Sequence, residues 1–388
     1  MNNRVPFLAK VPNGDFLLIQ DPLCRPPLQQ WAQSIRNSLE IEMNLGGDNQ
    51  IRIASLLNLA AFVEIMLGDK IVAKAICDAE LAWLANFATR ITEFPTISAL
   101  AIQPWINIGR LLRIEGKLQE ALWHFALVMR EPTREPLLLG PYCIPKQDWE
   151  ELLASDVGGN LWNIYVVDSL KTYFKCRRFD VAVEFIAKLR KGRLHFRDNL
   201  LLEGEVISHI GLGDYERSYW LAKSRAGLAI LDTVAFMLYE AHCSVELNRH
   251  DGAVALTRDL KSFVVLGGFD SFAPPTAMRC LEKLGVLLER LGQHVDAAQI
   301  YERAYKLALS ANDQPFQISF LSAWARQPGC GQSLKLKETR STLLSDCYYH
   351  DILRSETLPG QRRCQAFSNL RVAVSMATGG AFAEQSGH

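Results

Sequence analysis

One segment recurs along the chain, and this recurrence limits the folds open to it. Residues 104–129, PWINIGRLLRIEGKLQEALWHFALVM, hold a glycine within an apolar run, a second glycine seven residues later and an alanine five residues after that. Residues 278–306 repeat the arrangement closely. The matching residues of the two segments are Gly109 and Gly285, Gly116 and Gly292, and Ala121 and Ala297. Weaker copies begin near residues 54, 163, 199 and 234.

The recurring pattern predicts two short helices that pack antiparallel. Small residues at the crossing let the two backbones approach, and the glycine between the helices suits a helix C-terminus that needs positive φ. Large apolar residues at helical spacing are left to fill the gap to the next pair. Because one pair cannot bury its own apolar face, pairs of this kind stack. We therefore expect an all-α chain. The alternative is a generic helical domain with accidental glycines.

The pattern resembles the tetratricopeptide repeat (TPR) family over about residues 54–310. The residues at that family's signature positions in the first segment are Trp105, Ile108, Gly109, Leu112, Gly116, Ala121, Phe125 and Val128. The resemblance implies a right-handed α-solenoid of TPR-like helix pairs. The four weaker copies lack the signature tryptophan, and only two steps between repeats are close to the family's length of about 34 residues.

The N-terminal residues 1–50 differ from the repeats. Residues 5–22 read as apolar run, turn and apolar run around Asn13-Gly14, which favours a small N-terminal β-hairpin or an extended arm that caps the first helix. A lone hairpin is marginal in water, so it would pack on the end of the solenoid or pair with a second copy in a homo-oligomer. A helix is expected from about Leu28 to Met43.

The repeat domain is expected over residues 51–330, with a proline-rich insertion at 130–147. This insertion is either a functional loop or a cover for an apolar flank. A short helix should follow it, and a helix at 315–327 should seal the last repeat. The C-terminal extension, 331–388, is expected to be partly helical or disordered. Residues 342–353 have helical apolar spacing, and the last dozen residues look frayed.

Charge and cysteine usage exclude several classes of protein. The 42 basic and 42 acidic residues cancel, so no global field favours nucleic acid. Nine cysteines without a CxxC motif indicate reduced thiols. The N-terminus lacks the apolar run of a signal peptide, and the most apolar stretch, Leu56 to Leu67, is interrupted by Glu64 and too short to span a bilayer. A cytoplasmic protein without a membrane span is the simplest expectation.

The chain has no recognisable catalytic or cofactor motif. It lacks HExxH, GxSxG, a phosphate-binding GxxxxGK[ST], a calcium loop and a paired-cysteine zinc motif. We therefore predict no catalytic residue, no cofactor and no metal. His242 and Glu246 have the i, i+4 spacing of two metal ligands, but such a pair is more often a hydrogen bond in a groove.

The TPR resemblance implies which residues line the concave groove. These are Asn58, Phe62, Gln103, Asn107, Arg110, Arg113, Lys171, Lys175, Tyr239, His242, Glu246, Arg279 and Lys283, with the acidic Asp168, Glu203 and Glu282 among them. Helical spacing independently places Asn107, Arg110 and Arg113 on one polar ridge, and Lys171 and Lys175 on another. The alternative is that these residues are ordinary solvated helix faces.

Some TPR domains clamp the C-terminal carboxylate of a partner. Arg279 and Lys283 lie at the two positions that the last repeat of such a clamp uses, whereas Asn58 and Phe62 replace the lysine and asparagine of its first repeat. We therefore expect a looser groove that prefers anions.

Three functions remain open at this point. The first is an adaptor, a non-catalytic scaffold that binds a protein or peptide partner, with an acidic or C-terminal carboxylate segment, in the groove. The second is a sensor whose solenoid closes on a peptide or small ligand and changes its hold on a regulator. The third is an enzyme that uses Tyr239, His242 and Glu246 as acid–base groups, because fold alone does not exclude catalysis.

Overall fold

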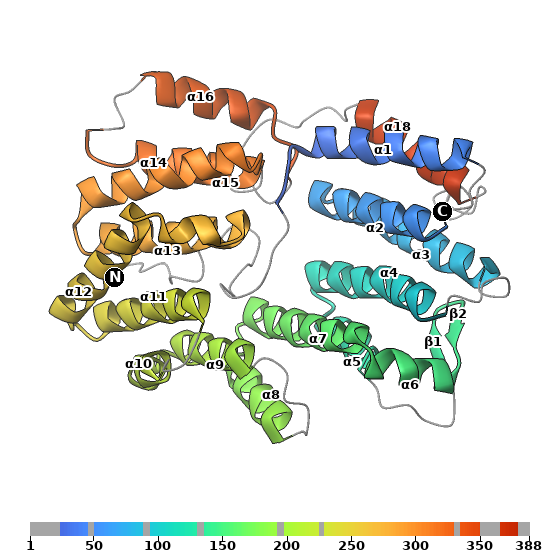
Figure 1. Ribbon diagram of the computed structural model, residues 1–388, viewed down its shortest axis with the longest axis horizontal. Helices are drawn as coiled ribbons and strands as arrows, with labels where there is room; N and C mark the ends of the chain where they lie inside the picture. Colours follow the sequence, from blue (N-terminus) through green and yellow to red (C-terminus); the bar gives the residue numbers. More distant parts are fainter. Residues whose placement is uncertain are drawn as a thin grey trace. The chain divides into compact units, whose positions relative to one another are not determined.

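The computed structural model describes residues 24–45, 50–87, 94–129, 136–191, 198–224, 229–329, 334–349 and 365–378. In these residues the chain is helical apart from one small β-hairpin (Figure 1). The predicted N-terminal β-hairpin at 5–22 lies outside them, as do residues 350–364 and 379–388 of the extension. The all-α class expected from the repeats is confirmed.

The chain divides into two compact units, and each combines segments from distant parts of the sequence. Among the described residues, unit 1 comprises 24–27 and Tyr173–Cys347, and unit 2 comprises Leu28–Thr172 and the residues from Tyr348 onward. Neither unit is a continuous stretch of chain. Residues 24–27 belong to unit 1, although the helices that follow them form unit 2, and the residues from Tyr348 onward belong to unit 2, although they follow unit 1 in the sequence.

Unit 2 begins with the predicted N-terminal helix and ends with a helix from the C-terminus. Its helices are α1 (Leu28–Asn44), α2 (Gln50–Leu67), α3 (Lys70–Phe87), α4 (Phe94–Glu115), α5 (Leu118–Leu127), α6 (Lys146–Ala154), α7 (Asp156–Lys175, whose last turn belongs to unit 1) and α18 (Gln365–Ala377). The helix expected from Leu28 is confirmed to within a residue, and α6 is the short helix expected after the prolines.

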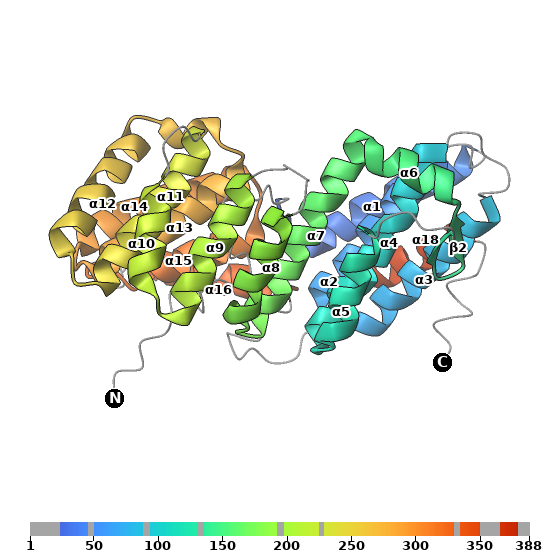
Figure 2. The same ribbon diagram turned by 90° about the horizontal axis from the view of Figure 1, so that it is seen from below.

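Unit 1 holds the remaining pairs. Its helices are α8 (Phe179–Lys191), α9 (Asp198–Leu212), α10 (Tyr215–Lys223), α11 (Ile230–Glu246), α12 (His250–Val265), the 3-10 helix η3 (Gly268–Ser271), α13 (Pro274–Arg290), α14 (His294–Ser310), α15 (Gln314–Ala325) and α16 (Leu334–Ser345). Helices α13, α14 and α15 pack side by side (Figures 1 and 2). Helix α15 confirms the helix expected at 315–327, and α16 packs against it. Helix α16 ends at Ser345, so the apolar spacing predicted over 342–353 does not form a helix at 346–349, where Cys347 and Tyr349 are buried; residues 350–353 lie outside the described part of the chain.

The same turn joins the two helices of each of the six predicted pairs. In the second pair the Gly116 N–H donates to the carbonyl of Arg113 at 3.2 Å, and the Lys117 N–H donates to that of Leu112 at 2.9 Å. This Schellman motif needs a left-handed residue at the turn. The six residues with positive φ at these turns are Gly68, Gly116, Arg177, Gly213, Asn248 and Gly292. Asn312 forms the same turn between α14 and α15.

The glycines inside the first helices permit close packing of the pair. A Cβ placed on Gly109 would lie 2.7 Å from Cε1 of Phe125 on α5. A Cβ on Gly285 would lie 2.6 Å from Cζ of Tyr301 on α14, and closer still to Cε1. An aromatic ring of the second helix therefore fills the space that a side chain on the first helix would need.

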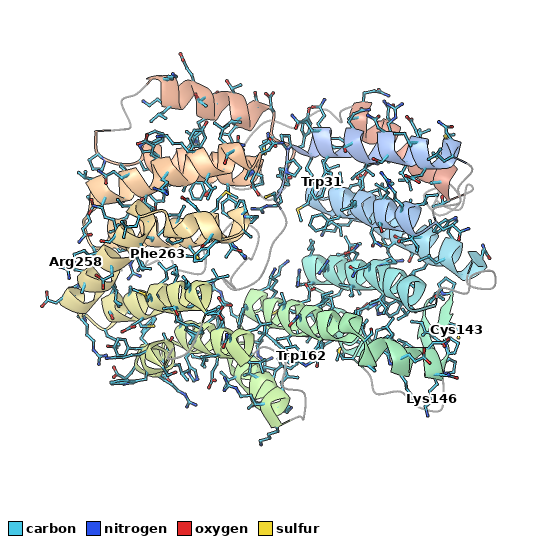
Figure 3. The ribbon with its side chains drawn as sticks, in the orientation of Figure 1. Trp31, Cys143, Lys146, Trp162, Arg258 and Phe263 are labelled. Carbon is cyan, nitrogen blue, oxygen red and sulfur yellow. The ribbon has the colours of Figure 1, made fainter. Side chains whose placement is uncertain are left out.

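The insertion at 130–147 contains a hairpin that the sequence reading did not predict. Strands β1 (Leu137–Leu139) and β2 (Tyr142–Ile144) pair antiparallel, with Leu137 opposite Ile144. Alternate side chains are buried, so that the hairpin packs one face on α3 and α4 while Cys143 is exposed (Figure 3). This contact supports the interpretation of the insertion as a cover for an apolar flank.

The N-terminal residues 24–27 bind to unit 1, and the C-terminal helix α18 binds to unit 2, each through hydrogen bonds of one arginine. In unit 1 the Arg25 N–H donates to Oδ2 of Asp313 at 2.9 Å, and the Gln314 N–H donates to the Arg25 carbonyl at 3.0 Å. In unit 2 α18 packs on α1 and α2, and Arg371 donates to both carboxylate oxygens of Glu64, which is 0% exposed. Arg371 also donates to Asp69 at 3.0 Å.

These contacts explain the acidic residue in the most apolar helix. Helix α2 is long and apolar enough to cross a bilayer by length and hydropathy alone, and core helices of globular proteins meet the same criterion. In this structure α2 packs against α1, α3 and α4, and half of it is buried inside the protein. Glu64 is tolerated there because Arg371 neutralises it.

Candidate functional site

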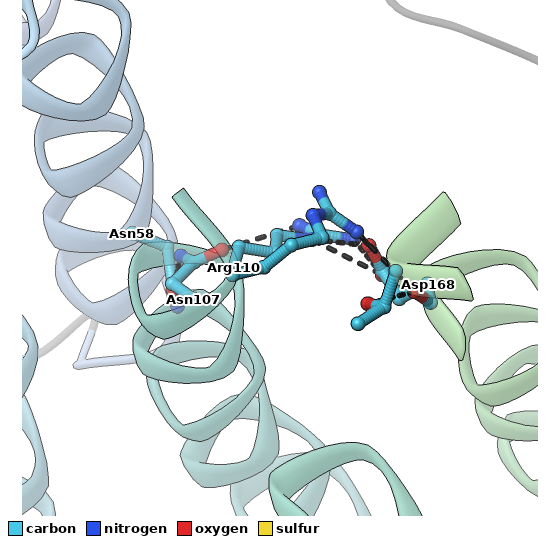
Figure 4. Close-up of polar contacts among 6 residues, drawn as sticks. Asn58, Asn107, Arg110 and Asp168 are labelled. Carbon is cyan, nitrogen blue, oxygen red and sulfur yellow. Dashed lines mark hydrogen bonds and ion pairs between the residues drawn. The ribbon is translucent and has the colours of Figure 1, made fainter. Parts of the chain in front are cut away.

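Two residues of the predicted polar ridges, Arg110 and Arg113, meet at one buried carboxylate in unit 2. Asp168 of α7 accepts from Nε and Nη2 of Arg110, at 3.1 and 2.9 Å to Oδ2, and from Nη1 of Arg113 at 2.8 Å to Oδ1 (Figure 4). Burial alone would raise the pKa of Asp168, but the charges of Arg110 and Arg113 outweigh it and hold that pKa well below its usual range. The carboxylate is therefore ionised at any physiological pH.

The helix spacing accounts for this meeting. Arg110 and Arg113 are three residues apart, so both project from one face of α4. Asp168 lies on α7, the first helix of the next pair, and Thr172 one turn later donates to the Asp168 carbonyl at 2.7 Å. Arg113 also lies 6.0 Å from the centre of the Phe125 ring, a cation–π distance. The two guanidinium groups are thus fixed by several partners each.

A chain of hydrogen bonds leads from Arg110 across α4 and α2 to α3. Arg110 Nη1 donates to Oδ1 of Asn107 at 3.2 Å, and Asn107 Nδ2 donates to Oδ1 of Asn58 at 3.1 Å. Asn58 Nδ2 then donates to Oε1 of Glu80 at 2.8 Å. Every bond in this chain has its donor on the Arg110 side, so the orientation of both amides is consistent along it (Figure 4).

Glu80 ends this chain as a buried acid. Its side chain is fully buried, and burial raises its pKa well above the usual range. Burial likewise raises the pKa of the Cys77 thiol, one turn earlier on α3. Glu80 was not among the predicted site residues, and because Lys74 and Asp78 lie in the same stretch, the sequence of 71–87 does not single it out.

The other predicted residues of α2, α4 and α7 differ in exposure. Phe62 is half-buried, with its ring edge-on to Trp31 at 5.8 Å between ring centres. Gln103 and Lys171 are half-buried, and Lys175 is exposed. The positive charge of Lys171 also lowers the pKa of Asp168. Within unit 2, the three cations Arg110, Arg113 and Lys171 thus lie near the one buried carboxylate of Asp168.

In unit 1 the predicted residues form a second, more deeply buried polar cluster. The Tyr239 hydroxyl on α11 donates to Oε1 of Glu203 on α9 at 2.7 Å, and both side chains are buried. Burial, then the charge of Glu203, raises the pKa of Tyr239 well above its usual range. This hydrogen bond couples the first helices of two neighbouring pairs.

His242 and Glu246 are connected through an arginine that the sequence reading missed. Arg290 of α13 lies 3.2 Å from Nδ1 of His242 and donates to Oε1 of Glu246 at 2.6 Å. Burial, and then the positive charges of Arg290 and Lys283, lower the pKa of His242 to about 3. The imidazole is therefore neutral and accepts from the guanidinium. Within the part of the chain that the structure describes, no group of three or more His, Cys, Asp and Glu side chains is placed to hold a metal ion.

The two remaining predicted residues lie on α13. Arg279 and Lys283 are only 1% and 4% exposed, and Glu282 beside them is also buried. Ser319 of α15 donates to Oε1 of Glu282 at 2.9 Å. A carboxylate from a partner could reach Arg279 or Lys283 only after the groups that cover them had moved.

The comparisons with known proteins add no relative. No model of a protein family matches the sequence, and no curated protein matches it. The resemblance to TPR proteins thus depends on the repeated residues and on the helix pairs and turns that they form.

Proposed function

We propose that the chain is a non-catalytic, TPR-type adaptor of the cytoplasm that binds an extended acidic segment of a protein partner. The binding surface is the polar face of α2, α4 and α7 in unit 2. The observation that supports this proposal most is the pair of arginines, Arg110 and Arg113, held on the buried Asp168 with an excess of positive charge around them.

The geometry suits an anion more than a cation. Arg110 and Arg113 are held on Asp168, and 27% and 15% of their side chains remain exposed. Lys171 and Lys175 follow on α7, one helical turn apart. Each charge-assisted hydrogen bond contributes about 1.5–3 kcal/mol. Two or three of them, with apolar contact at Phe62, would reach micromolar affinity, about −8 kcal/mol.

The burial of the unit 1 cluster argues against the enzyme hypothesis. Tyr239 and His242 are both almost fully buried, and each has a partner within the protein. Because the pKa of His242 is about 3, its imidazole is too weak a base to take up a proton near neutral pH. The adaptor hypothesis needs no such group.

Native mass spectrometry of the protein purified gently from its own cells tests the proposal. The wild type should retain a protein partner, and Lys171→Gln/Lys175→Gln should lose it. The matched control is Lys188→Gln/Lys191→Gln, which removes two exposed lysines from α8 and should keep the partner. Retention of the partner by the first variant, or a bound small molecule in place of a protein, would count against the adaptor.

A further inference from the structure

An exposed group of aromatic and basic side chains lies on the second helices of unit 1. Glu216, Tyr219, Trp220 and Lys223 follow one face of α10 at the spacing i, i+3, i+4 and i+7. Arg249, the residue before α12, joins them. We call these five residues the α10 patch. It shares no residue with the site on α2, α4 and α7.

The α10 patch is held in one arrangement by its own polar contacts. Trp220 Nε1 donates to Oε1 of Glu216 at 3.0 Å. Arg249 Nη2 donates to both oxygens of the same carboxylate, at 3.0 and 2.8 Å. The hydrogen bond from Arg249 lowers the pKa of Glu216, so the carboxylate is ionised at neutral pH. The indole is therefore oriented before any partner arrives, which reduces the entropy lost on binding.

The ring faces are already occupied by cations. Lys223 Nζ lies 5.3 Å from the centre of the Trp220 ring and 5.4 Å from that of Tyr219. The guanidinium of Arg249 lies 4.7 Å from the Tyr219 ring centre. The two rings are edge-to-face, 5.3 Å apart. A cage for a cationic ligand needs free ring faces, so these contacts exclude that use of the patch.

The exposed side chains of the patch include the indole and both basic residues. Trp220 is 57% exposed, and Lys223 and Arg249 are also exposed. The patch contains the two cations Lys223 and Arg249 and the one carboxylate of Glu216, so its net charge is +1, and the exposed Arg217 beside it pairs with Glu205 at 3.8 Å. Tryptophan, tyrosine and arginine are the residue types most enriched at the energetic centres of protein interfaces.

We propose that the α10 patch is a second docking surface, which binds an acidic protein segment with an apolar side chain. The carboxylates of the segment would lie against Lys223 and Arg249, and its apolar side chain against the indole edge of Trp220. Because the patch and the unit 2 site are made of different residues, either proposal can fail while the other holds.

Trp123 provides an internal control. Each of Trp123 and Trp220 lies seven residues after the turn glycine of its pair, and their exposures are 55% and 57%. The ring neighbours of Trp123 are Trp105 and His124, rather than cations. An apolar ligand without charge preference would contact both tryptophans, whereas an acidic segment should select Trp220.

Nuclear magnetic resonance on the full chain can follow the indole N–H signals of both residues, assigned with Trp220→Phe and Trp123→Phe. The probe is a peptide of alternating glutamate and leucine. We expect the Trp220 signal to shift and the Trp123 signal to stay. In Lys223→Gln/Arg249→Gln the half-saturating concentration should rise at least about tenfold, whereas Lys171→Gln/Lys175→Gln should leave the Trp220 titration unchanged.

Three results would overturn the proposal. They are an unmoved Trp220 signal, an equal shift with a peptide of alternating lysine and leucine, and tighter binding of an oligothymidylate than of the acidic peptide. The last result would identify the patch as a surface for single-stranded nucleic acid. Unchanged circular dichroism and Tm in each variant establish that a lost shift reflects lost binding.

Discussion

Replacing Gly285 by alanine tests whether the repeat glycines are required by packing. The new Cβ would lie 2.6 Å from Cζ of Tyr301, whose ring is buried and cannot turn away. Overpacking of this kind costs about 1–3 kcal/mol. The better helix propensity of alanine returns up to about 1 kcal/mol. We expect a net loss of about 1–2 kcal/mol in the free energy of unfolding of unit 1.

Gly252→Ala is the matched control, because a Cβ there meets nothing within 4 Å and α12 has ordinary helical φ at that residue. This change should stabilise the same unit by about 0.5–1 kcal/mol. The two alanine variants should thus differ by about 2 kcal/mol, or about 4–8 °C in Tm for a unit of this size. Calorimetry of the full chain measures both.

A partial rescue identifies the mechanism. Tyr301→Leu removes the ring that the new methyl group meets, so Gly285→Ala/Tyr301→Leu should lose less stability than the sum of the single changes. The reasoning would be refuted if Gly285→Ala were as stable as Gly252→Ala, or if the two changes at Gly285 and Tyr301 were simply additive.

Three further predictions concern buried charges in unit 2, each followed by denaturant titration with a probe in that unit. Asp168→Asn leaves Arg110 without its counter-charge and should cost about 3–5 kcal/mol at neutral pH. The pKa of Asp168 is lower in the folded than in the unfolded protein, so this stabilisation is present above the unfolded pKa of about 3.9. The stability difference between wild type and variant should therefore vanish as the pH falls below that value. A difference independent of pH would contradict the argument. The folded pKa of Glu80 is raised, so above about pH 4.3 the wild type should lose stability relative to Glu80→Gln by up to about 1.4 kcal/mol per pH unit. If the stabilities of the two proteins changed equally with pH, Glu80 would not be a buried acid with a raised pKa. Arg371→Ala leaves the Glu64 carboxylate buried and unpaired by arginine and should cost about 3–5 kcal/mol, whereas unchanged stability would show that α18 is not required for unit 2.

Local features of the fold were predictable because their causes lie close together in the sequence. The turns at Gly116 and Gly292 follow from glycine's access to positive φ and from the spacing of the small residues around it. The weaker copies share the spacing of these two, although Arg177 and Asn248 replace glycine at the turns of two of them. An asparagine adopts this conformation at small cost, whereas an arginine there gives no recognisable sequence signal.

The long-range pairings could not be read from the sequence. Arg371 and Glu64 are separated by 307 residues, and nothing in either segment identifies the other as its partner. For the same reason the exchange of chain ends between the two units was not foreseen. The β-hairpin at 137–144 did leave a signal, since Gly140-Pro141 separates two short apolar runs, but the prolines around it favoured a loop.

The candidate site was predicted in part. Spacing placed Asn107, Arg110 and Arg113 on one ridge, and the structure brings all three into one hydrogen-bonded network with Asn58 and Asp168. Spacing within one helix cannot reveal how much of a side chain the neighbouring helices cover. Arg279 and Lys283 were expected in a groove and are buried, because α13 is enclosed by neighbouring elements along almost its whole length.

The central proposal is that an acidic partner segment binds the polar face of α2, α4 and α7. Hydrogen–deuterium exchange on the complex that co-purifies with the protein tests it most directly, because it reports which helices the partner covers. The account predicts slower exchange in α4 around Arg110 and in the second half of α7, relative to the free protein, with α5 unchanged. Protection confined to other helices, with α4 and α7 exchanging as in the free protein, would contradict it.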